Sequence, residues 1–170
     1  PNLNDTVNII KELESAGADI IELGMPYSDP LADGPTIQAS GEKALENGMS
    51  IKVLFDQLKD IRKEVSIPII LMGYLNPVMQ YGVEAFCKKA AEVGIDGLIL
   101  PDLPFMEYET MYQKSFEENN LSNIFLVTPQ TSDDRLKKID SLSSGFIYIV
   151  SSNSTTGNET KELDDTTSYF

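Results

Sequence analysis

The sequence predicts an α/β protein in which short buried strands alternate with amphipathic helices. Two observations lead to this class. Five short runs rich in branched apolar residues recur along the chain, and each is almost continuously hydrophobic, as is typical of a parallel strand covered on both faces. Helical patterns with charged outer positions lie between these runs. The expected strands are residues 18–24, 67–73, 96–102, 123–129 and 146–150.

The first expected helix comes from the stretch "LNDTVNIIKELESAG". Asp5 or Thr6 is its candidate N-cap, and Gly17 is expected to end it. The spacing of its apolar side chains predicts that they share one face, which consists of Val7, Ile10 and Leu13.

Further helical patterns fill the remaining intervals between strands. One begins near Thr36, and "GVEAFCKKAAEVG" predicts a helix that ends at Gly94. Two amphipathic segments cover about residues 105–118 and 132–141. The stretch "IKVLFDQLKDIRKEV" predicts another helix, with apolar positions Ile51, Val53, Leu54, Leu58 and Ile61.

The order of these elements favours a TIM (β/α)8 barrel over a doubly wound sheet. Successive strands after the first start roughly 20–30 residues apart, and no Gly-x-Gly-x-x-Gly motif follows a strand. Because a full barrel needs about 250 residues, the 170 residues are expected to form a single incomplete barrel domain, 1–170, with about five βα units. The first strand and the last two βα units are expected to lie outside this sequence.

Composition excludes several classes of function. The formal net charge of -14 makes nucleic acid and anionic membrane surfaces poor partners. No apolar run approaches the roughly 18 residues of a membrane span, and Cys87, the single cysteine, has no disulfide partner within the chain. Helical spacing predicts that Cys87 is a small buried apolar residue. A cytoplasmic setting is therefore expected.

The chain contains no histidine. This absence removes Ser-His-Asp and Cys-His nucleophile systems together with every histidine metal site. Acid–base chemistry must then come from carboxylates, tyrosine or lysine.

Glu22 is an unusual residue for a buried strand. It lies at the carboxyl end of its strand, where a parallel barrel builds its active site, and an apolar setting shared with Ile20 would oppose its ionisation. A carboxyl group of this kind can donate a proton near neutral pH. The alternative is a structural acid paired with a lysine or with backbone amides.

Asp33 follows in a loop that contains three prolines, Pro26, Pro30 and Pro35. A long rigid loop at the carboxyl face of a barrel is typical of an active-site loop. The alternative for Asp33 is a helix cap or an Asx-turn, and the prolines would then simply form a stiff turn.

At these residues the sequence resembles a known family. The stretch "IIELGMPYSDPLADGPTIQAS" resembles the signature of the tryptophan synthase alpha chain family, in which this strand and loop carry the two catalytic acids. The resemblance runs in order from about residue 5 through "ILMGYLNPVMQYG", "GIDGLILPDLP", "IFLVTPQTSDDRL" and "FIYIVSSNSTTG".

The resemblance implies a retro-aldol cleavage of indole-3-glycerol phosphate to indole and glyceraldehyde 3-phosphate. Glu22 matches the acid–base residue that protonates the indole C3 carbon and takes the proton of the glycerol hydroxyl. Asp33 matches the acid that holds the indole N–H. Tyr148 matches a tyrosine that supports the reaction near the glycerol portion, although it could instead be an aromatic that fills the barrel.

The resemblance also assigns substrate contacts. Tyr74 matches a position near the substrate, and residues 151–170 match a mobile active-site loop in which Thr156 contacts the Asp33 loop and Gly157 binds phosphate. Read without the family, this Ser/Thr-rich segment is a solvated flexible loop. The family pattern is broken by Ser152, Ser154 and Thr155.

The resemblance implies a beta subunit as partner, in an alpha2beta2 tetramer. No cofactor is expected on this chain, since pyridoxal phosphate would belong to the beta partner. The resemblance assigns these positions to the partner face: Pro26, Asp29, Asn76, Asp102 and Pro104. Asp102 could instead cap the helix that follows Pro104.

Two other functions remain open from the sequence. A sugar-phosphate epimerase or isomerase is disfavoured, because many of those enzymes use histidine bases or histidine-bound metals. A non-catalytic alpha-like chain that only binds and activates a beta partner is disfavoured by the retention of both Glu22 and Asp33.

Overall fold

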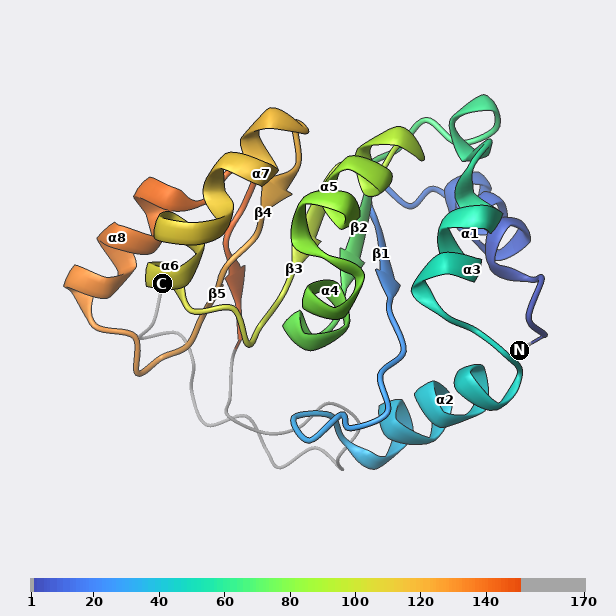
Figure 1. Ribbon diagram of the computed structural model, residues 1–170, viewed down its shortest axis with the longest axis horizontal. Helices are drawn as coiled ribbons and strands as arrows, with labels where there is room; N and C mark the ends of the chain where they lie inside the picture. Colours follow the sequence, from blue (N-terminus) through green and yellow to red (C-terminus); the bar gives the residue numbers. More distant parts are fainter. Residues whose placement is uncertain (1, 151–170) are drawn as a thin grey trace.

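The structure is a computed structural model that describes residues 2–150 of the chain. Helices and parallel strands alternate along these residues, as the sequence predicted (Figure 1). The expected active-site loop, residues 151–170, lies outside the described residues. In chain order the elements are α1 (Thr6–Ser15), β1 (Ile21–Gly24), α2 (Pro35–Glu46), α3 (Ile51–Leu58), the 3₁₀ turn η1 (Ile61–Lys63), β2 (Ile69–Met72), α4 (Leu75–Tyr81), α5 (Val83–Glu92), β3 (Gly97–Ile99), α6 (Phe105–Glu107), the π-helical turn η2 (Tyr108–Tyr112), α7 (Gln113–Glu118), β4 (Ser122–Asn123), β5 (Leu126–Val127), α8 (Asp133–Leu142) and β6 (Tyr148–Ile149).

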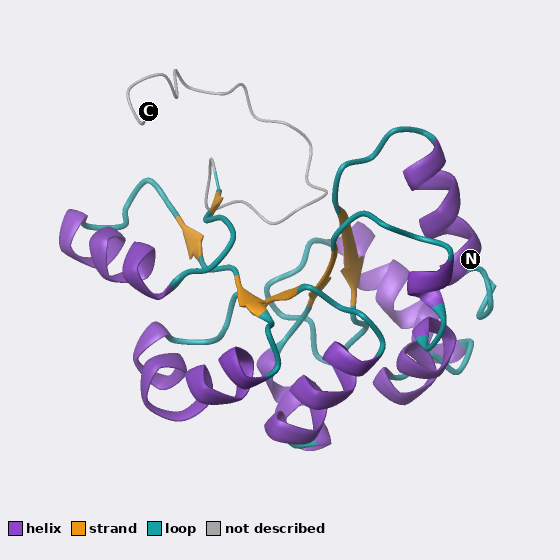
Figure 2. Cartoon of the chain, turned by 90° about the horizontal axis from the view of Figure 1, so that it is seen from above, coloured by secondary structure: helices purple, strands orange, loops and turns teal. Residues whose placement is uncertain are grey.

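The strands form part of a TIM barrel. β1, β2, β3 and β4 pair in that order, β5 pairs with β6, and every pairing is parallel. The apolar run predicted as one strand at 123–129 pairs with β3 along its first half and with β6 along its second, which is the stagger of tilted barrel strands. Seen from above, the strands follow an open arc with helices along its outer side (Figure 2).

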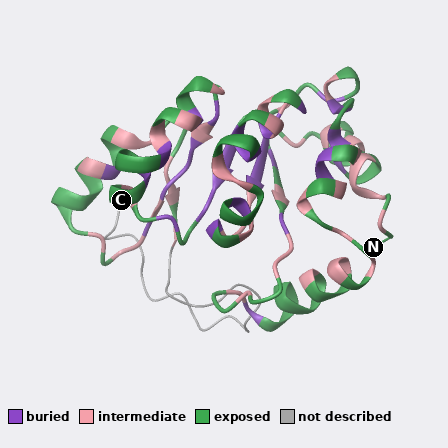
Figure 3. Ribbon diagram, in the orientation of Figure 1, coloured by how far each residue is buried: buried purple, intermediate pink, exposed green. Residues whose placement is uncertain are grey.

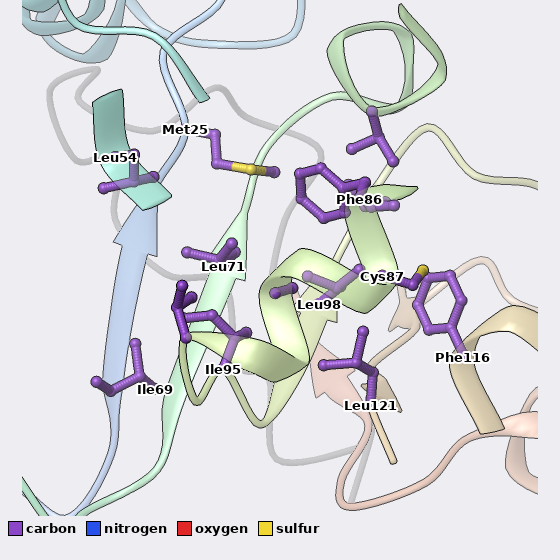
Figure 4. Packing of buried hydrophobic residues seen from close by; sticks show 14 of the residues in the cluster. Met25, Leu54, Ile69, Leu71, Phe86, Cys87, Ile95, Leu98, Phe116 and Leu121 are labelled. Atoms are coloured by element: carbon purple, nitrogen blue, oxygen red, sulfur yellow. The ribbon is translucent and has the colours of Figure 1, made fainter. Parts of the chain in front are cut away.

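Alternation along the strands separates two apolar clusters. Outward-facing strand residues pack against the helices and form the main core, of which Figure 4 shows a part. Its strand members are Ile21, Leu23, Ile69, Leu71, Leu98 and Val127. The inner face carries a second cluster, which consists of Ile70, Ile99 and Ile124 with Met72, Leu126 and Tyr148 packed against them.

The helices bury their apolar positions unequally. Ile10 is buried as predicted, whereas Leu13 is 45% exposed and does not belong to the packed face of α1. α3 buries Leu54 and Leu58, together with Phe55, which the sequence analysis missed. α2 buries no residue and lies away from the strands (Figures 1 and 3).

One helix was not predicted. Residues 75–81 form α4, in an interval where the sequence predicted no helix. Pro77 lies in the first turn of α4, where a backbone N–H has no partner inside the helix, so the missing donor has no cost there. The predicted helix over 105–118 is present, with the π-helical turn η2 in its middle.

Cys87 is fully buried in α5, as predicted. Burial raises the pKa of its thiol to about 12, so the sulfur stays protonated and serves as an apolar side chain.

Arg62 joins the turn η1 to the loop before β3. Its Nε donates to the Gly94 carbonyl at 2.7 Å and one Nη donates to the Ile67 carbonyl at 2.6 Å. The other Nη bonds to the Asp96 carboxylate, which also accepts the Ile69 N–H at 2.8 Å. The guanidinium group therefore fixes the start of both β2 and β3.

Gly94 lies under this arginine, and replacing it with alanine is expected to lower the free energy of unfolding by roughly 2–4 kcal/mol. A left-handed backbone costs alanine about 1–2 kcal/mol, and moving the Arg62 side chain aside adds about 1–2 kcal/mol, in the lower part of the usual range for overpacking. Gly94 has φ +88°, and a Cβ there would lie 2.4 Å from Arg62 Cγ. Urea denaturation measures the loss.

Gly17→Ala is the matched control, because Gly17 has φ +95° with no atom within 4 Å of the added Cβ. This variant should lose only about 1–2 kcal/mol for the backbone. Equal losses at the two positions would show that Arg62 moves aside and that its hydrogen bonds contribute little.

Candidate active site

Glu22 lies in β1 on the inner face of the sheet, opposite Ile70 in the register of β1 and β2. Among the residues of the six described strands, it alone carries a charge. The apolar neighbour of Glu22 is therefore Ile70 on the adjacent strand. Ile20, which was predicted to provide the apolar setting, precedes β1 and is 49% exposed.

The carboxyl group of Glu22 keeps contact with solvent, yet the protein atoms around it raise its pKa above the ordinary value. Burial is the sole cause of this shift. No ion pair or amide among residues 2–150 offsets it, so the structure does not support the alternative of a paired structural acid.

The raised pKa of Glu22 predicts how stability depends on pH. Above the ordinary pKa of 4.5, the folded state binds more protons at this site than the unfolded state, so stability falls as pH rises toward the folded pKa. Glu22→Gln removes that effect. The variant is expected to be more stable than the wild type at about pH 7, with the difference vanishing below about pH 4.

Urea denaturation at both pH values measures the change. Glu84→Gln is the control, since Glu84 is an exposed glutamate of α5. A wild-type protein that is more stable than Glu22→Gln at neutral pH would mean that the folded state favours the ionised carboxylate.

The proline loop after β1 places Asp33 beside α2. The Asp33 N–H donates to the Pro30 carbonyl at 3.1 Å, and the Asp33 carbonyl accepts from Gln38 Nε2 at 2.8 Å. Gly34 is the N-cap of α2, and no side chain caps the helix. The carboxylate of Asp33 is thus not used as a helix cap, one of the two structural alternatives to a catalytic role, the other being an Asx-turn.

Tyr74 connects the loop after β2 to the proline loop. Its hydroxyl oxygen accepts the Ala32 N–H at 3.1 Å. Burial raises the pKa of the phenol; the Ala32 N–H opposes this shift, and the charge of Asp33 and a hydrogen bond to its carboxylate reinforce it. The phenol therefore stays protonated and donates toward Asp33.

Tyr27 also belongs to this site, although it was not predicted from the sequence. Its ring lies 5.1 Å from that of Tyr74, and its hydroxyl accepts from Asn76 Nδ2 at 2.7 Å. The only signal in the sequence is an aromatic residue inside a proline-rich loop.

Asp102, which follows β3, does not cap the next helix. Its two carboxylate oxygens accept the Leu75 N–H at 2.9 and 3.1 Å, at the start of α4. Pro104 is the N-cap residue of α6, with no side-chain hydrogen bond. The alternative of a cap on the following helix is not observed, because the Asp102 carboxylate binds the first backbone N–H of α4 instead.

Two of the three predicted catalytic residues, Glu22 and Asp33, line adjoining cavities. Glu22 lines a cavity of about 330 Å³ between α1, α2 and β1. Asp33 and Tyr74 line a second cavity of about 230 Å³, and the lining residues common to both cavities are Gly24, Pro26, Ser40 and Ala44. Tyr148 lies on the same inner face as Glu22, against the second apolar cluster, and outside both cavities.

The residues assigned to a partner face are partly brought together. Pro26, Asp29 and Asn76 line a groove of about 460 Å³. Asp102 and Pro104 lie outside this groove.

Two predicted substrate contacts, Thr156 and Gly157, lie outside the described residues. Within residues 2–150, no group of histidine, cysteine, aspartate and glutamate residues could hold a metal ion. No helix in the same part of the chain is long and apolar enough to cross a membrane. The cytoplasmic setting stays a prediction.

A parallel α/β arc with helices on its outer side and Glu22 on its inner face is part of a TIM barrel, a fold whose active sites lie at the carboxyl ends of the strands. Comparison with known proteins specifies the family. The family model described as the tryptophan synthase alpha chain matches residues 1–169, so the chain belongs to that family.

Individual relatives agree with this assignment. The chain is 61% identical over 170 residues to the tryptophan synthase alpha chains of Flavobacterium psychrophilum and Flavobacterium johnsoniae, covering 100% of this chain and 67% of each relative. A crystal structure of tryptophan synthase subunit alpha from Legionella pneumophila is 39% identical with a TM-score of 0.81, and the match covers 86% of this chain and 56% of that chain. The chain thus spans about two thirds of the length of the curated relatives.

Proposed function

We propose that the chain carries the acid–base residues of an enzyme that cleaves indole-3-glycerol phosphate to indole and glyceraldehyde 3-phosphate in tryptophan biosynthesis. The observation that supports this most directly is Glu22, the only charged residue in the described strands, whose pKa is raised by its surroundings. A carboxyl group with a raised pKa on the inner face of a barrel suits a general acid.

The proposed reaction needs two carboxyl groups in different roles. Glu22 protonates the indole C3 carbon, which turns the ring into a leaving group for carbon–carbon cleavage. The electron pair of the broken bond returns to the ring, the hydroxyl of the glycerol chain becomes a carbonyl, and Glu22 takes up its proton. Asp33 accepts a hydrogen bond from the indole N–H and stabilises the positive charge that develops on the ring.

The remaining residues have supporting roles in the proposal. Tyr148 supports the acid near the glycerol portion, Tyr74 borders the substrate, and Thr156 and Gly157 bind it from the loop at 151–170. These steps use side chains alone, and no cofactor is proposed on this chain.

A beta subunit is the proposed partner. Solved relatives include the tryptophan synthase complex of Pyrococcus furiosus, 40% identical with a TM-score of 0.79, and an a2b2 complex from the same organism described in terms of mutual activation. By analogy we propose that the partner binds at the groove lined by Pro26, Asp29 and Asn76. Asp102 and Pro104, which lie outside this groove, are proposed as further partner contacts.

Indole release from indole-3-glycerol phosphate tests this function. The assay compares the full-length natural gene product with the 170-residue chain, each with and without purified beta subunit. The full-length protein is expected to release indole. A protein that stimulates the beta subunit yet releases no indole would be a binding-only alpha-like chain, and the proposed chemistry would be wrong.

A further inference from the structure

The loops after β1, β2 and β3 are joined by a continuous series of contacts. Asp102 from the β3 loop binds the backbone at Leu75, and the adjacent residue Tyr74 binds the backbone at Ala32 in the β1 loop. Asp33 follows Ala32 directly. The series thus leads from a residue outside both cavities to one of the two acids.

The first contact supplies a helix cap from a distant part of the chain. Tyr74 is the N-cap residue of α4 but makes no side-chain cap hydrogen bond. Both oxygens of Asp102 lie within 3.1 Å of the Leu75 nitrogen instead. A carboxylate is also favoured at a helix N-terminus by the helix dipole. This contact holds the backbone at Leu75 and therefore the position of the adjacent residue, Tyr74.

The second contact, between the Tyr74 hydroxyl and the Ala32 N–H, connects Tyr74 to the proline loop. The Tyr74 hydroxyl accepts the Ala32 N–H and faces Asp33, while the ring of Tyr27 packs against its own ring at 5.1 Å. The rigid phenol ring links the Tyr74 backbone to its hydroxyl, so a shift of that backbone moves the hydroxyl relative to the Ala32 N–H. Such a shift would therefore weaken the Ala32 hydrogen bond.

We propose that Asp102 is a positioning residue for Asp33, acting through the Leu75 N–H and the Tyr74 hydroxyl. The geometric coupling stands on the contacts alone, whereas its effect on the reaction rests on the proposed function. Asp102 itself need not contact substrate, since it lies outside the cavities that Glu22 and Asp33 line.

Amide hydrogen exchange in the full-length protein tests the coupling without any substrate. Tyr74→Phe should speed exchange of the Ala32 amide by about tenfold, the net value of one hydrogen bond. Asp102→Ala should speed exchange at Leu75 and, by a similar factor, at Ala32. Asp102→Asn keeps one acceptor oxygen and should stay within about threefold of the wild type at both amides.

Glu14 offers a matched control. Its carboxylate accepts the backbone N–H groups of Ser66 and Ile67 at 2.8 and 3.1 Å, before β2 and away from the proline loop. Glu14→Ala should speed exchange at those two amides and leave Ala32 unchanged. Faster exchange at Leu75 alone in Asp102→Ala would reduce Asp102 to a simple helix cap and overturn the proposal.

Kinetics give a second, independent measurement. Asp102→Ala and Tyr74→Phe should each lower kcat for indole release by about tenfold, and the double variant should fall no more than about twofold further, because both changes break one series of contacts. A double variant whose kcat falls by the product of the two single losses would overturn the proposal. If the wild type releases no indole, the proposed function fails, and the exchange experiment still decides the coupling.

Discussion

Replacing Glu22 with glutamine is expected to lower kcat for indole release by roughly 10²–10⁴-fold, the usual contribution of a positioned general acid or base. Glutamine keeps the size and hydrogen-bonding capacity of the side chain but has no proton to transfer. Because Glu22 lies on a rigid strand beside Ile70, the substitution leaves the shape of the inner face unchanged. Substrate affinity should therefore stay within a few-fold of the wild type.

Steady-state kinetics and equilibrium binding of indole-3-glycerol phosphate to the variant separate these effects. Glu84→Gln removes the same charge at the exposed surface of α5 and should leave both quantities unchanged. If affinity in Glu22→Gln falls by as much as kcat, Glu22 binds substrate and is not the proton donor.

The largest loss of stability is expected for Phe86→Ala. Phe86 of α5 is 0% exposed, and its ring lies 5.2 Å from Phe55 of α3 and 5.9 Å from Tyr81 of α4 (Figure 4 shows Phe86 in the core). Truncating a buried phenylalanine costs about 3–5 kcal/mol in lost apolar burial and cavity formation. That is a large part of the roughly 5–15 kcal/mol that stabilises a typical domain.

Urea denaturation of Phe86→Ala measures the loss, and Phe146→Ala is the control. Phe146 is 40% exposed, so its truncation should change the free energy of unfolding by no more than about 0.5 kcal/mol. A loss at Phe86 similar to that at Phe146 would show that the three helices repack around the missing ring.

The order of strands and most helices could be predicted, because their apolar patterns are local properties of the sequence. The runs at 18–24 and 67–73 contain β1 and β2, and Gly17 and Gly94 lie just past the helices they were predicted to end, each with a positive φ. α4 was missed, since Asn76 and Pro77 carry a turn signal that is equally compatible with a first helical turn.

The candidate site was predicted in part. Glu22 could be found from the sequence because a charge inside an apolar strand is visible without any structure. The residues that surround Glu22 could not be predicted from the sequence. Ile70, which faces Glu22, comes from a strand 48 positions later in the chain, and its placement depends on strand pairing.

The sequence by itself determined the class of fold and the family, since these follow from local periodicity and from a continuous motif, and it singled out Glu22 and Asp33 as the candidate acids. Only the tertiary structure decided that Asp102 binds Leu75, that Tyr74 holds Ala32, and that Leu13 is exposed. The reason is physical: parallel strands bring the loops at their carboxyl ends side by side, and a side chain there bonds to whichever backbone group lies nearest in space, not in sequence.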